Sequence, residues 1–300
     1  MRDAAIDAAS RLGVFEWLRT PSTPEALAAA RGLDGTWLAW LLAGLAGEGL
    51  LARDGARYRV TSPRDVIRSA AGGALLADVI ARRRPLAWSE IAGNPDAAAL
   101  TVLVDAPGEA VTAELARELV PALAAGGQLV DVGCGSGALA AAMLLAAPLA
   151  TALLVDRPHV LATAASRLAR FGARVELQAA DIVSFPVPPC RAALLAQVLH
   201  LIPPDDANAL VLRSARALAP GGVLAVVEVD VEHASDAPAM AAWFALSLLV
   251  HGLPGLVARS RIETWFADAG LVDIAAHPVP ARPGVVVVTG RTPPSPLFAD

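Results

Sequence analysis

The segment LVDVGCGSGALA, residues 129–140, constrains the fold of this chain more than any other stretch. An apolar run ends at Asp131, glycines occupy positions 133, 135 and 137, and a helical, alanine-rich pattern follows. Glycine lets the backbone turn sharply and approach a ligand closely, and the amides at the start of a helix can face a polar ligand. The segment therefore predicts a buried strand, a ligand-binding turn and a helix. It also satisfies the G-x-G-x-x-A pattern, so alone it does not identify the ligand.

From residue 128 onward, short apolar segments alternate with helical ones. The apolar segments are LVDVG (129–133), TALLVD (151–156), RVELQAAD (174–181), RAALLAQVL (191–199), GVLAVVEV (222–229) and GVVVVTGR (284–291). Such alternation is typical of strand–helix–strand crossovers, in which a mostly parallel sheet carries helices on both faces. The pattern predicts an α/β, Rossmann-like domain, to which we assign residues 116–300.

The N-terminal part, residues 1–115, has a different pattern. Helical segments with turn signals precede a short alternating segment, ARYRVT (56–61), which favours a winged helix. Its candidate recognition helix, 35–51, contains tryptophans and leucines but no basic residue, so DNA binding is disfavoured. We expect these helices to form a homodimer instead. The apolar residues that favour this interpretation are Leu12, Val14, Phe15, Trp17, Trp37, Trp40 and Leu41.

Composition excludes several classes of protein. The net charge is −5 and all 24 basic residues are arginine, so nucleic acid is not an expected partner. The longest apolar stretch, 137–155, is interrupted by Pro148 and predicts a buried helix and strand, not a membrane span. Two cysteines, Cys134 and Cys190, are too few for a disulfide framework. Acidic residues in MRDAAIDAAS replace the basic start of an export signal, and together these features predict a cytoplasmic protein.

Two acids follow later strands of the predicted sheet. Asp156 ends TALLVD, where α/β cofactor sites place an acid that accepts hydrogen bonds from ribose hydroxyls. Both NAD and S-adenosylmethionine would use an acid there. Asp181 follows RVELQAA and suits an acid that contacts adenine, and LAPGGVLAVVEV has the turn and late strand typical of methyltransferases.

On these motifs, residues 128–230 resemble the class I S-adenosylmethionine-dependent methyltransferases. The resemblance is closer to the small-molecule O-methyltransferases of plant phenolic and bacterial natural-product pathways, whose N-terminal domain carries a stretch similar to RLGVFEWL (11–18). It implies a seven-stranded sheet, S-adenosylmethionine as cofactor and a small apolar or aromatic acceptor. The cofactor-binding residues that it implies are Asp131, Gly133, Gly135, Gly137, Asp156, Arg157, Asp181, Ile182 and Gln197.

The same resemblance implies a catalytic pair. In that family a histidine after the fourth strand deprotonates the acceptor hydroxyl, and AQVLHLIPP places His200 there. Imidazole suits this role because it accepts a proton near neutral pH. Glu228 in AVVEV matches a family glutamate that would orient the imidazole. The family has Asp-Trp after this histidine, whereas Leu201 and Ile202 follow here.

These departures leave alternatives open. Carbon or nitrogen methylation, or a reaction that keeps the cofactor but transfers no methyl group, would also suit the sequence. A winged-helix regulator that senses a small molecule is a further alternative. His233 and His251 are substitute bases, and neither has neighbours at metal-ligand spacing, so we expect no metal. In related enzymes the apolar segment 237–250 lines the acceptor pocket, which makes Met240, Trp243 and Phe244 candidate substrate contacts.

Overall fold

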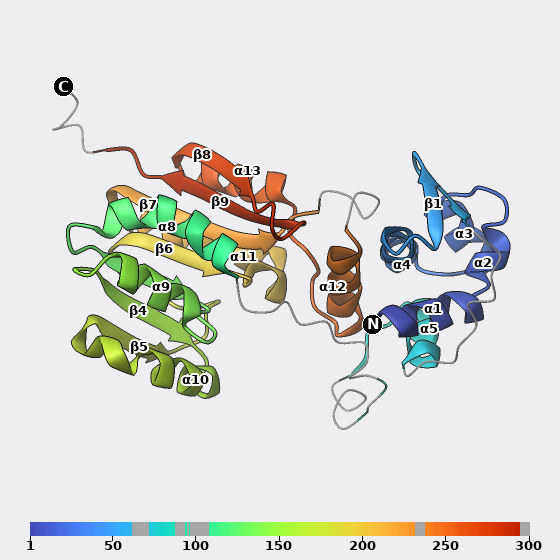
Figure 1. Ribbon diagram of the computed structural model, residues 1–300, viewed down its shortest axis with the longest axis horizontal. Helices are drawn as coiled ribbons and strands as arrows, with labels where there is room; N and C mark the ends of the chain where they lie inside the picture. The colour runs from blue at the N-terminus through green and yellow to red at the C-terminus, as the bar shows by residue number, and fades with distance from the viewer. Residues whose placement is uncertain (62–71, 88–93, 95, 97–107, 232–237, 295–300) are drawn as a thin grey trace. The chain divides into compact units, whose positions relative to one another are not determined.

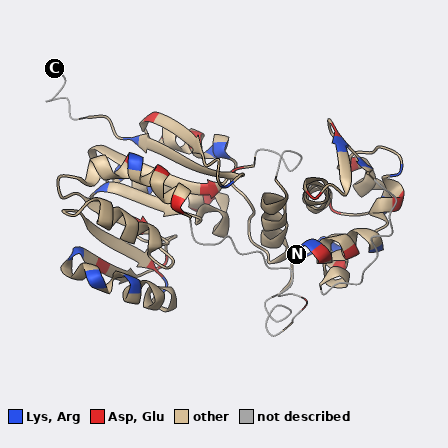
Figure 2. Cartoon of the chain, viewed as in Figure 1, with Lys and Arg blue, Asp and Glu red and all other residues tan. Residues whose placement is uncertain are grey.

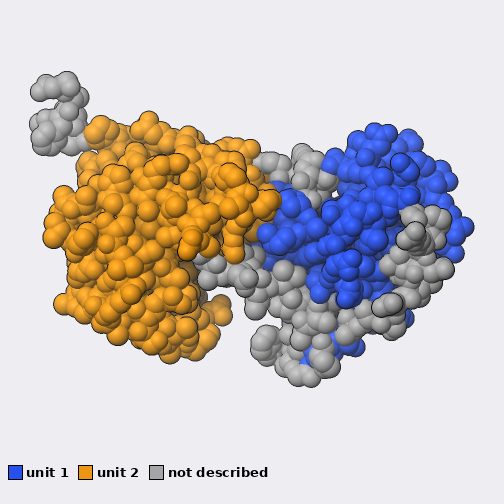
Figure 3. Space-filling model, viewed as in Figure 1, with its two compact units in different colours: residues 1–104, 231–256 blue, residues 105–230, 257–300 orange. Residues whose placement is uncertain are grey.

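The computed structural model describes residues 1–61, 72–87, 94, 96, 108–231 and 238–294. The chain divides into two compact units (Figure 3): unit 1 comprises residues 1–104 and 231–256, and unit 2 comprises residues 105–230 and 257–300. The chain thus leaves unit 2 after the strand that carries Glu228, enters unit 1 again and then returns. Our sequence-based division at residue 115 did not include this return, because it depends on tertiary packing and not on local periodicity.

The described residues of unit 1 form helices and one small antiparallel sheet. Thr23 accepts a hydrogen bond from the Ala26 amide at the start of α3 (Pro24–Arg31). Asp34 accepts from the amides of Thr36 and Trp37 at the start of α4 (Gly35–Gly47), so both helices begin at capping residues. Strands β1 and β2 pair as a hairpin. The winged-helix interpretation stays a prediction. The elements are α1 (Arg2–Arg11), α2 (Val14–Trp17), α3 (Pro24–Arg31), α4 (Gly35–Gly47), β1 (Leu51–Asp54), β2 (Arg57–Val60), α5 (Gly73–Arg82) and α12 (Ala239–Val250).

Helix α12 packs closely on α4 within unit 1. A side chain at Gly44 would overlap the ring of Trp243, and one at Gly47 would overlap Ala239. Glycine at these two positions therefore lets the helix backbones approach each other. The Trp243 indole also donates a hydrogen bond to Glu48, over 3.4 Å. This packing fixes the returning segment in the hydrophobic core of unit 1.

Unit 2 contains one seven-stranded sheet in the order β5-β4-β3-β6-β7-β9-β8 (Figure 1). The strands from β5 to β7 are parallel, and β9 runs antiparallel to both β7 and β8. The strands are β3 (Gln128–Val132), β4 (Thr151–Asp156), β5 (Val175–Ala179), β6 (Cys190–Ala196), β7 (Leu218–Val229), β8 (Val272–Pro278) and β9 (Val285–Arg291). The helices are α8 (Glu109–Leu123), α9 (Ala138–Ala146), α10 (Pro158–Leu168), α11 (Pro204–Arg216) and α13 (Arg259–Asp268), with 3-10 turns η1 (Ala169–Arg174) and η2 (Leu199–Leu201).

Alternate residues along the strands face two different hydrophobic cores, one on each face of the sheet. Leu129 and Leu154 face the core with α8, α9 and α10, whereas Val130 and Val155 face the core with α11 and α13. Most strand residues are uncharged, and the charged residues lie mainly on helices and loops (Figure 2). A sheet buried on both faces explains why its strands read as nearly continuous apolar runs. Among the described residues, no helix is long and apolar enough to cross a membrane.

Candidate active site

The carboxyl ends of β3, β4, β6 and β7 meet at one edge of the sheet because these strands are parallel. In α/β proteins, ligands bind outside the carboxyl ends of such strands. Asp131, Asp156 and Glu228 lie at or near the ends of β3, β4 and β7, and His200 lies in η2 shortly after β6. The fold therefore brings residues from four separate sequence segments to one edge.

The loop after β3 depends on its glycines. Gly133, Gly135 and Gly137 have φ values of 78°, 54° and 68°, a region that other residues rarely adopt. A side chain at Gly133 would come within 2.6 Å of Val198, and one at Gly137 within 2.8 Å of Leu168. Apart from the adjacent residues of the loop, no atom of the described residues lies within 4 Å of the corresponding position at Gly135. The outer two glycines therefore allow close packing, and the middle one leaves space beside the loop.

Asp156 organises this loop. One carboxylate oxygen, Oδ2, accepts a hydrogen bond from the Gly135 amide at 2.9 Å, and Oδ1 accepts from the Arg157 amide at 2.7 Å. Arg157 precedes α10, and its side chain is exposed. Each carboxylate oxygen has a second lone pair, so Asp156 keeps capacity for two hydroxyl donors, as a ribose ring offers.

Asp131 is a buried acid, and the described residues leave one of its carboxylate oxygens without a hydrogen bond. Its side chain is 2% exposed, and Oδ1 has no hydrogen-bond partner among the described residues. Burial, and to a smaller extent the nearby Asp156, raises the pKa of Asp131 to about 7. A cationic ligand beside this loop would stabilise the ionised form of Asp131, and a hydrogen-bond donor would supply a partner for Oδ1.

Asp181 and Ile182 form the turn after β5. The Asp181 carboxylate accepts a hydrogen bond from the Val183 amide at 2.9 Å, which closes the turn, and its side chain is otherwise exposed. The Ala180 amide donates to the carbonyl of Asp156 at 3.1 Å. This bond places the turn next to the end of β4, at the same edge as the glycine loop.

Gln197 is strained and incompletely hydrogen-bonded. Its φ is 57°, which is unusual for a residue with a side chain, and its amide donates to the Val227 carbonyl at 2.8 Å. The side-chain Oε1 is buried and has no hydrogen-bond partner among the described residues. Strained residues of this kind cluster at functional sites.

His200 and Glu228 form a buried pair. The His200 Nδ1 lies 2.8 Å from Glu228 Oε2, and the two side chains are 4% and 0% exposed. The other glutamate oxygen, Oε1, accepts from the amides of Val198 and Leu199 at 3.0 and 2.9 Å. Glu228 therefore binds both the imidazole and the backbone that carries it. Since Val198 also contacts Gly133, this segment packs directly against the glycine loop.

The remaining predicted residues lie in unit 1. Trp243 and Phe244 are buried on α12, and Met240 on the same helix is 40% exposed. All other predicted site residues belong to unit 2. The Nδ1 of His251 lies 2.8 Å from the Ser247 carbonyl at the end of α12, and His233 lies outside the described residues. Among the residues described, no group of three or more His, Cys, Asp or Glu side chains could hold a metal ion.

The sequence did not lead us to predict the residues that connect the His200–Glu228 pair to the glycine loop. It did not single out the amides of Val198 and Leu199, or the contact of Val198 with Gly133. One signal was available, since Glu228 is the only charged residue in the apolar run 222–229, and a buried carboxylate needs several donors. The exposure of Leu201 beside His200, 46%, also required the structure.

Comparisons with known proteins identify the family of this chain. A family model described as an O-methyltransferase domain matches residues 96–270. The 3-hydroxy-5-methyl-1-naphthoate 3-O-methyltransferase of Streptomyces sahachiroi is 29% identical over 164 residues, which are 53% of this chain and 48% of that protein. The phenazine O-methyltransferase PhzM of Lysobacter antibioticus is 30% identical over 167 residues, 54% of this chain and 48% of that protein. The chain therefore spans about half the length of the curated relatives it matches.

Solved structures with the same fold cover nearly the whole chain. An O-methyltransferase family 2 protein from Planctomyces limnophilus, in complex with apigenin, aligns with a TM-score of 0.62 and 24% identity over 97% of this chain and 92% of that chain. Human N-acetylserotonin methyltransferase, in complex with SAM, aligns with a TM-score of 0.57 and 22% identity over 97% and 94%. The predicted Rossmann-like class I methyltransferase fold is confirmed.

Proposed function

Because this chain belongs to the O-methyltransferase domain family, we propose that it methylates a hydroxyl group of a small apolar or aromatic natural product, with S-adenosylmethionine as methyl donor and His200 as general base. The observation that carries this proposal is the buried His200–Glu228 pair, which is packed through Val198 against the glycine loop. Relatives named for methylating a hydroxynaphthoate and a phenazine support an aromatic acceptor.

The residues of the loop fit this cofactor. The second lone pairs of Asp156 suit ribose hydroxyls, and the open side of Gly135 leaves room for the ligand. Asp131 has an orphaned oxygen and a pKa raised to about 7, and the positive charge of S-adenosylmethionine would favour its ionised form. When bound, the cofactor supplies a methyl group activated by a positive sulfur.

The hydrogen bond to Glu228 determines what the imidazole can do. An ionised carboxylate only accepts hydrogen bonds, so in the proposed mechanism, with Glu228 ionised and His200 neutral, the imidazole proton would reside on Nδ1. The basic lone pair then lies on Nε2, which accepts the proton of the acceptor hydroxyl. Removing this proton strengthens a weak nucleophile, a step that contributes about 10²–10⁴-fold to the rate of typical enzymes.

Glu228 is a positioning residue in this mechanism. Its three hydrogen bonds restrain the ring of His200 and the backbone from Val198 to Leu199. Alignment of nucleophile and methyl group lowers the barrier because orientation is established before the reaction begins. The exposed, apolar Leu201 beside His200 suits an aromatic acceptor.

Product analysis tests this proposal. We expect the protein, incubated with S-adenosylmethionine and a panel of phenolic and polyketide acceptors, to yield a product heavier by one methyl group on oxygen. Methylation on carbon or nitrogen would contradict the O-methyl assignment. Cofactor binding without any methylated product would instead support a reaction that retains the cofactor.

Calorimetry tests the cofactor separately. We expect S-adenosylhomocysteine to bind with micromolar affinity, and NADH not to bind. Binding of the nicotinamide cofactor in place of S-adenosylhomocysteine would contradict the proposal, whatever the acceptor panel showed.

We further propose a homodimer formed by unit 1, in a reducing compartment such as the cytoplasm. Trp17 is 37% exposed, and Leu12, Phe15 and Trp40 are partly buried, which supports a contact surface, whereas Val14, Leu41 and Trp37 are taken up by the core of unit 1. Both cysteines are free thiols. Light scattering at micromolar concentration tests the dimer, and a monomer would contradict it.

A further inference from the structure

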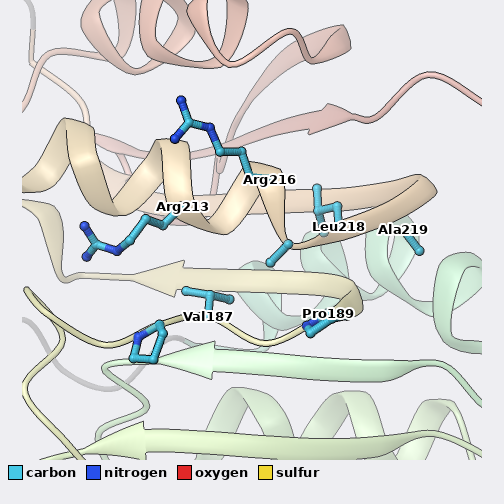
Figure 4. Close-up of a pocket in the computed structure, with 8 residues that line it drawn as sticks. Val187, Pro189, Arg213, Arg216, Leu218 and Ala219 are labelled. Carbon is cyan, nitrogen blue, oxygen red and sulfur yellow. The ribbon is translucent and has the colours of Figure 1, made fainter.

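Unit 2 has a pocket of about 490 Å³ away from the candidate active site (Figure 4). It lies between the last turn of α11, the loop before β6 and the start of β7, and its walls include Pro186, Val187, Pro189 and Leu218. Because β6 and β7 begin here, the pocket is at the opposite edge of the sheet from His200 and Glu228. Its volume falls in the range of small-molecule sites.

Two arginines give the pocket a positive charge. Arg213 and Arg216 lie in the last turn of α11 and line the pocket, and none of its lining residues is acidic. Neither arginine forms an ion pair with any residue that the structure describes. Basic residues commonly stabilise the last turn of a helix. That role explains their position on α11, but no described residue provides a counterion for their charges.

Arg213 is held in place by neutral groups. Its guanidinium donates to the carbonyls of Ile182 and Val183 at 3.2 and 2.6 Å, while its Nε is buried and has no acceptor among the described residues. The carbonyls restrain the side chain without neutralising it. A cation that is already ordered loses little conformational entropy when an anion binds. Arg216 is exposed, and Figure 4 shows its guanidinium turned away from Val187 and Pro189. Its side chain makes no hydrogen bond or ion pair with a described residue, so turning toward a bound anion would break no such contact.

We propose that this pocket binds an organic anion with a flat apolar body, of the class of aromatic carboxylates. A guanidinium group pairs with both oxygens of a carboxylate. The proline, valine and leucine walls would pack against the ring system. An inorganic anion would use the arginines but not these walls, so it should bind much more weakly.

Calorimetry with 1-naphthoate tests the proposal, with 1-naphthamide as the uncharged control ligand. Arg216→Gln is the main variant because this exposed side chain does not hold the fold together. Arg167→Gln is the matched control, since Arg167 is also an exposed arginine in the last turn of a helix, α10, and does not line the pocket. Thermal melting verifies that both variants are folded.

We expect Arg216→Gln to weaken 1-naphthoate binding about tenfold and Arg216→Glu to weaken it further, because a charge-assisted contact is lost and then reversed. Arg167→Gln should leave the affinity unchanged, and 1-naphthamide should bind at least tenfold more weakly than 1-naphthoate. Unchanged binding in both Arg216 variants would place the ligand elsewhere and overturn the proposal. Inorganic phosphate that binds as tightly as 1-naphthoate would overturn the assignment to an organic anion.

Discussion

Glu228 and Asp131 are both buried acids near the carboxyl ends of strands that flank β6, but the hydrogen bonding of their carboxylates differs. Glu228 accepts hydrogen bonds from two backbone amides and lies within hydrogen-bond distance of His200. Oδ1 of Asp131 has no hydrogen-bond partner in the described part of the chain, and burial raises the pKa of Asp131 to about 7. Burying an ionised carboxylate is costly unless donors surround it. The described residues therefore supply hydrogen bonds to both oxygens of Glu228, whereas they leave Oδ1 of Asp131 available to a ligand.

This comparison predicts that the two acids serve different steps. Glu228 positions the base, so its loss should affect turnover. Asp131 is proposed to face the cofactor, so its loss should affect cofactor binding and the pH dependence of stability. The following substitutions test this separation.

The largest effect should come from His200→Ala, because this substitution removes the imidazole that Glu228 positions. We expect turnover to fall by about 10²–10⁴-fold, because general-base assistance operates in the transition state. Calorimetry should show nearly unchanged affinity for S-adenosylhomocysteine. Near-normal turnover would mean that the acceptor ionises without help, and would favour a carbon nucleophile or a reaction without methyl transfer.

Glu228→Gln should lower turnover less than His200→Ala, because it misorients the base without removing it. The amide oxygen can still accept from Val198 and Leu199, but the amide nitrogen would then face Nδ1 and favour the proton on Nε2. Turnover at saturating acceptor and the chemical shifts of the His200 ring nitrogens measure the two consequences. An unchanged tautomer would contradict the positioning role.

Asp131→Asn should change how stability depends on pH. The pKa of Asp131 is about 7 in the folded protein, and about 4 is normal for an unfolded chain. Protonated Asp131 therefore contributes fully to the stability of the folded protein below about pH 4. This contribution is lost as the pH rises through 7, and the free energy of unfolding falls by a few kcal/mol. Urea unfolding of the cofactor-free protein between pH 4 and 8 should show this loss in the wild type and a flatter profile in the variant. Equal slopes would contradict the interpretation of Asp131.

Asp156→Ala should weaken S-adenosylhomocysteine binding by about 1–3 kcal/mol, through loss of charge-assisted hydrogen bonds. The Gly135 and Arg157 amides also lose their acceptor, so Asp156→Asn serves as a control that retains one oxygen. Calorimetry measures both variants. If alanine and asparagine bind the ligand as tightly as the wild type, Asp156 is a structural cap only.

The smallest effects should distinguish two glycines of the loop. Both Gly133→Ala and Gly135→Ala place a side chain at positive φ, which costs about 1 kcal/mol. Only the Gly133 variant also presses on Val198 and thereby on the segment of His200. We expect lower turnover for Gly133→Ala, with partial recovery in the double variant with Val198→Ala. Equal turnover for the two single variants would show that the contact with Val198 has no catalytic consequence.

The sequence by itself determined the elements of unit 2 and the positions of its polar residues. Apolar segments from 129 to 291 predicted strands that the structure contains, because burial on both faces of a sheet leaves a direct trace in composition. Asp131, Asp156 and the glycines were found for the same reason: a strand, a tight turn and a helix are local, and each has its own residue preferences. His200 and Glu228 were identified through the family resemblance, and the structure brings them together.

Tertiary structure alone decided how these parts combine. It placed α12 in unit 1 and the Trp243 ring against Gly44. The role of Trp243 as a substrate contact stays a prediction. It also determined that Glu228 binds the amides of Val198 and Leu199, while Asp131 keeps an oxygen that no described residue binds. Local periodicity specifies which face of an element is apolar. Which donors reach a buried carboxylate depends on the register of strands far apart in sequence, and only the packed fold determines that register.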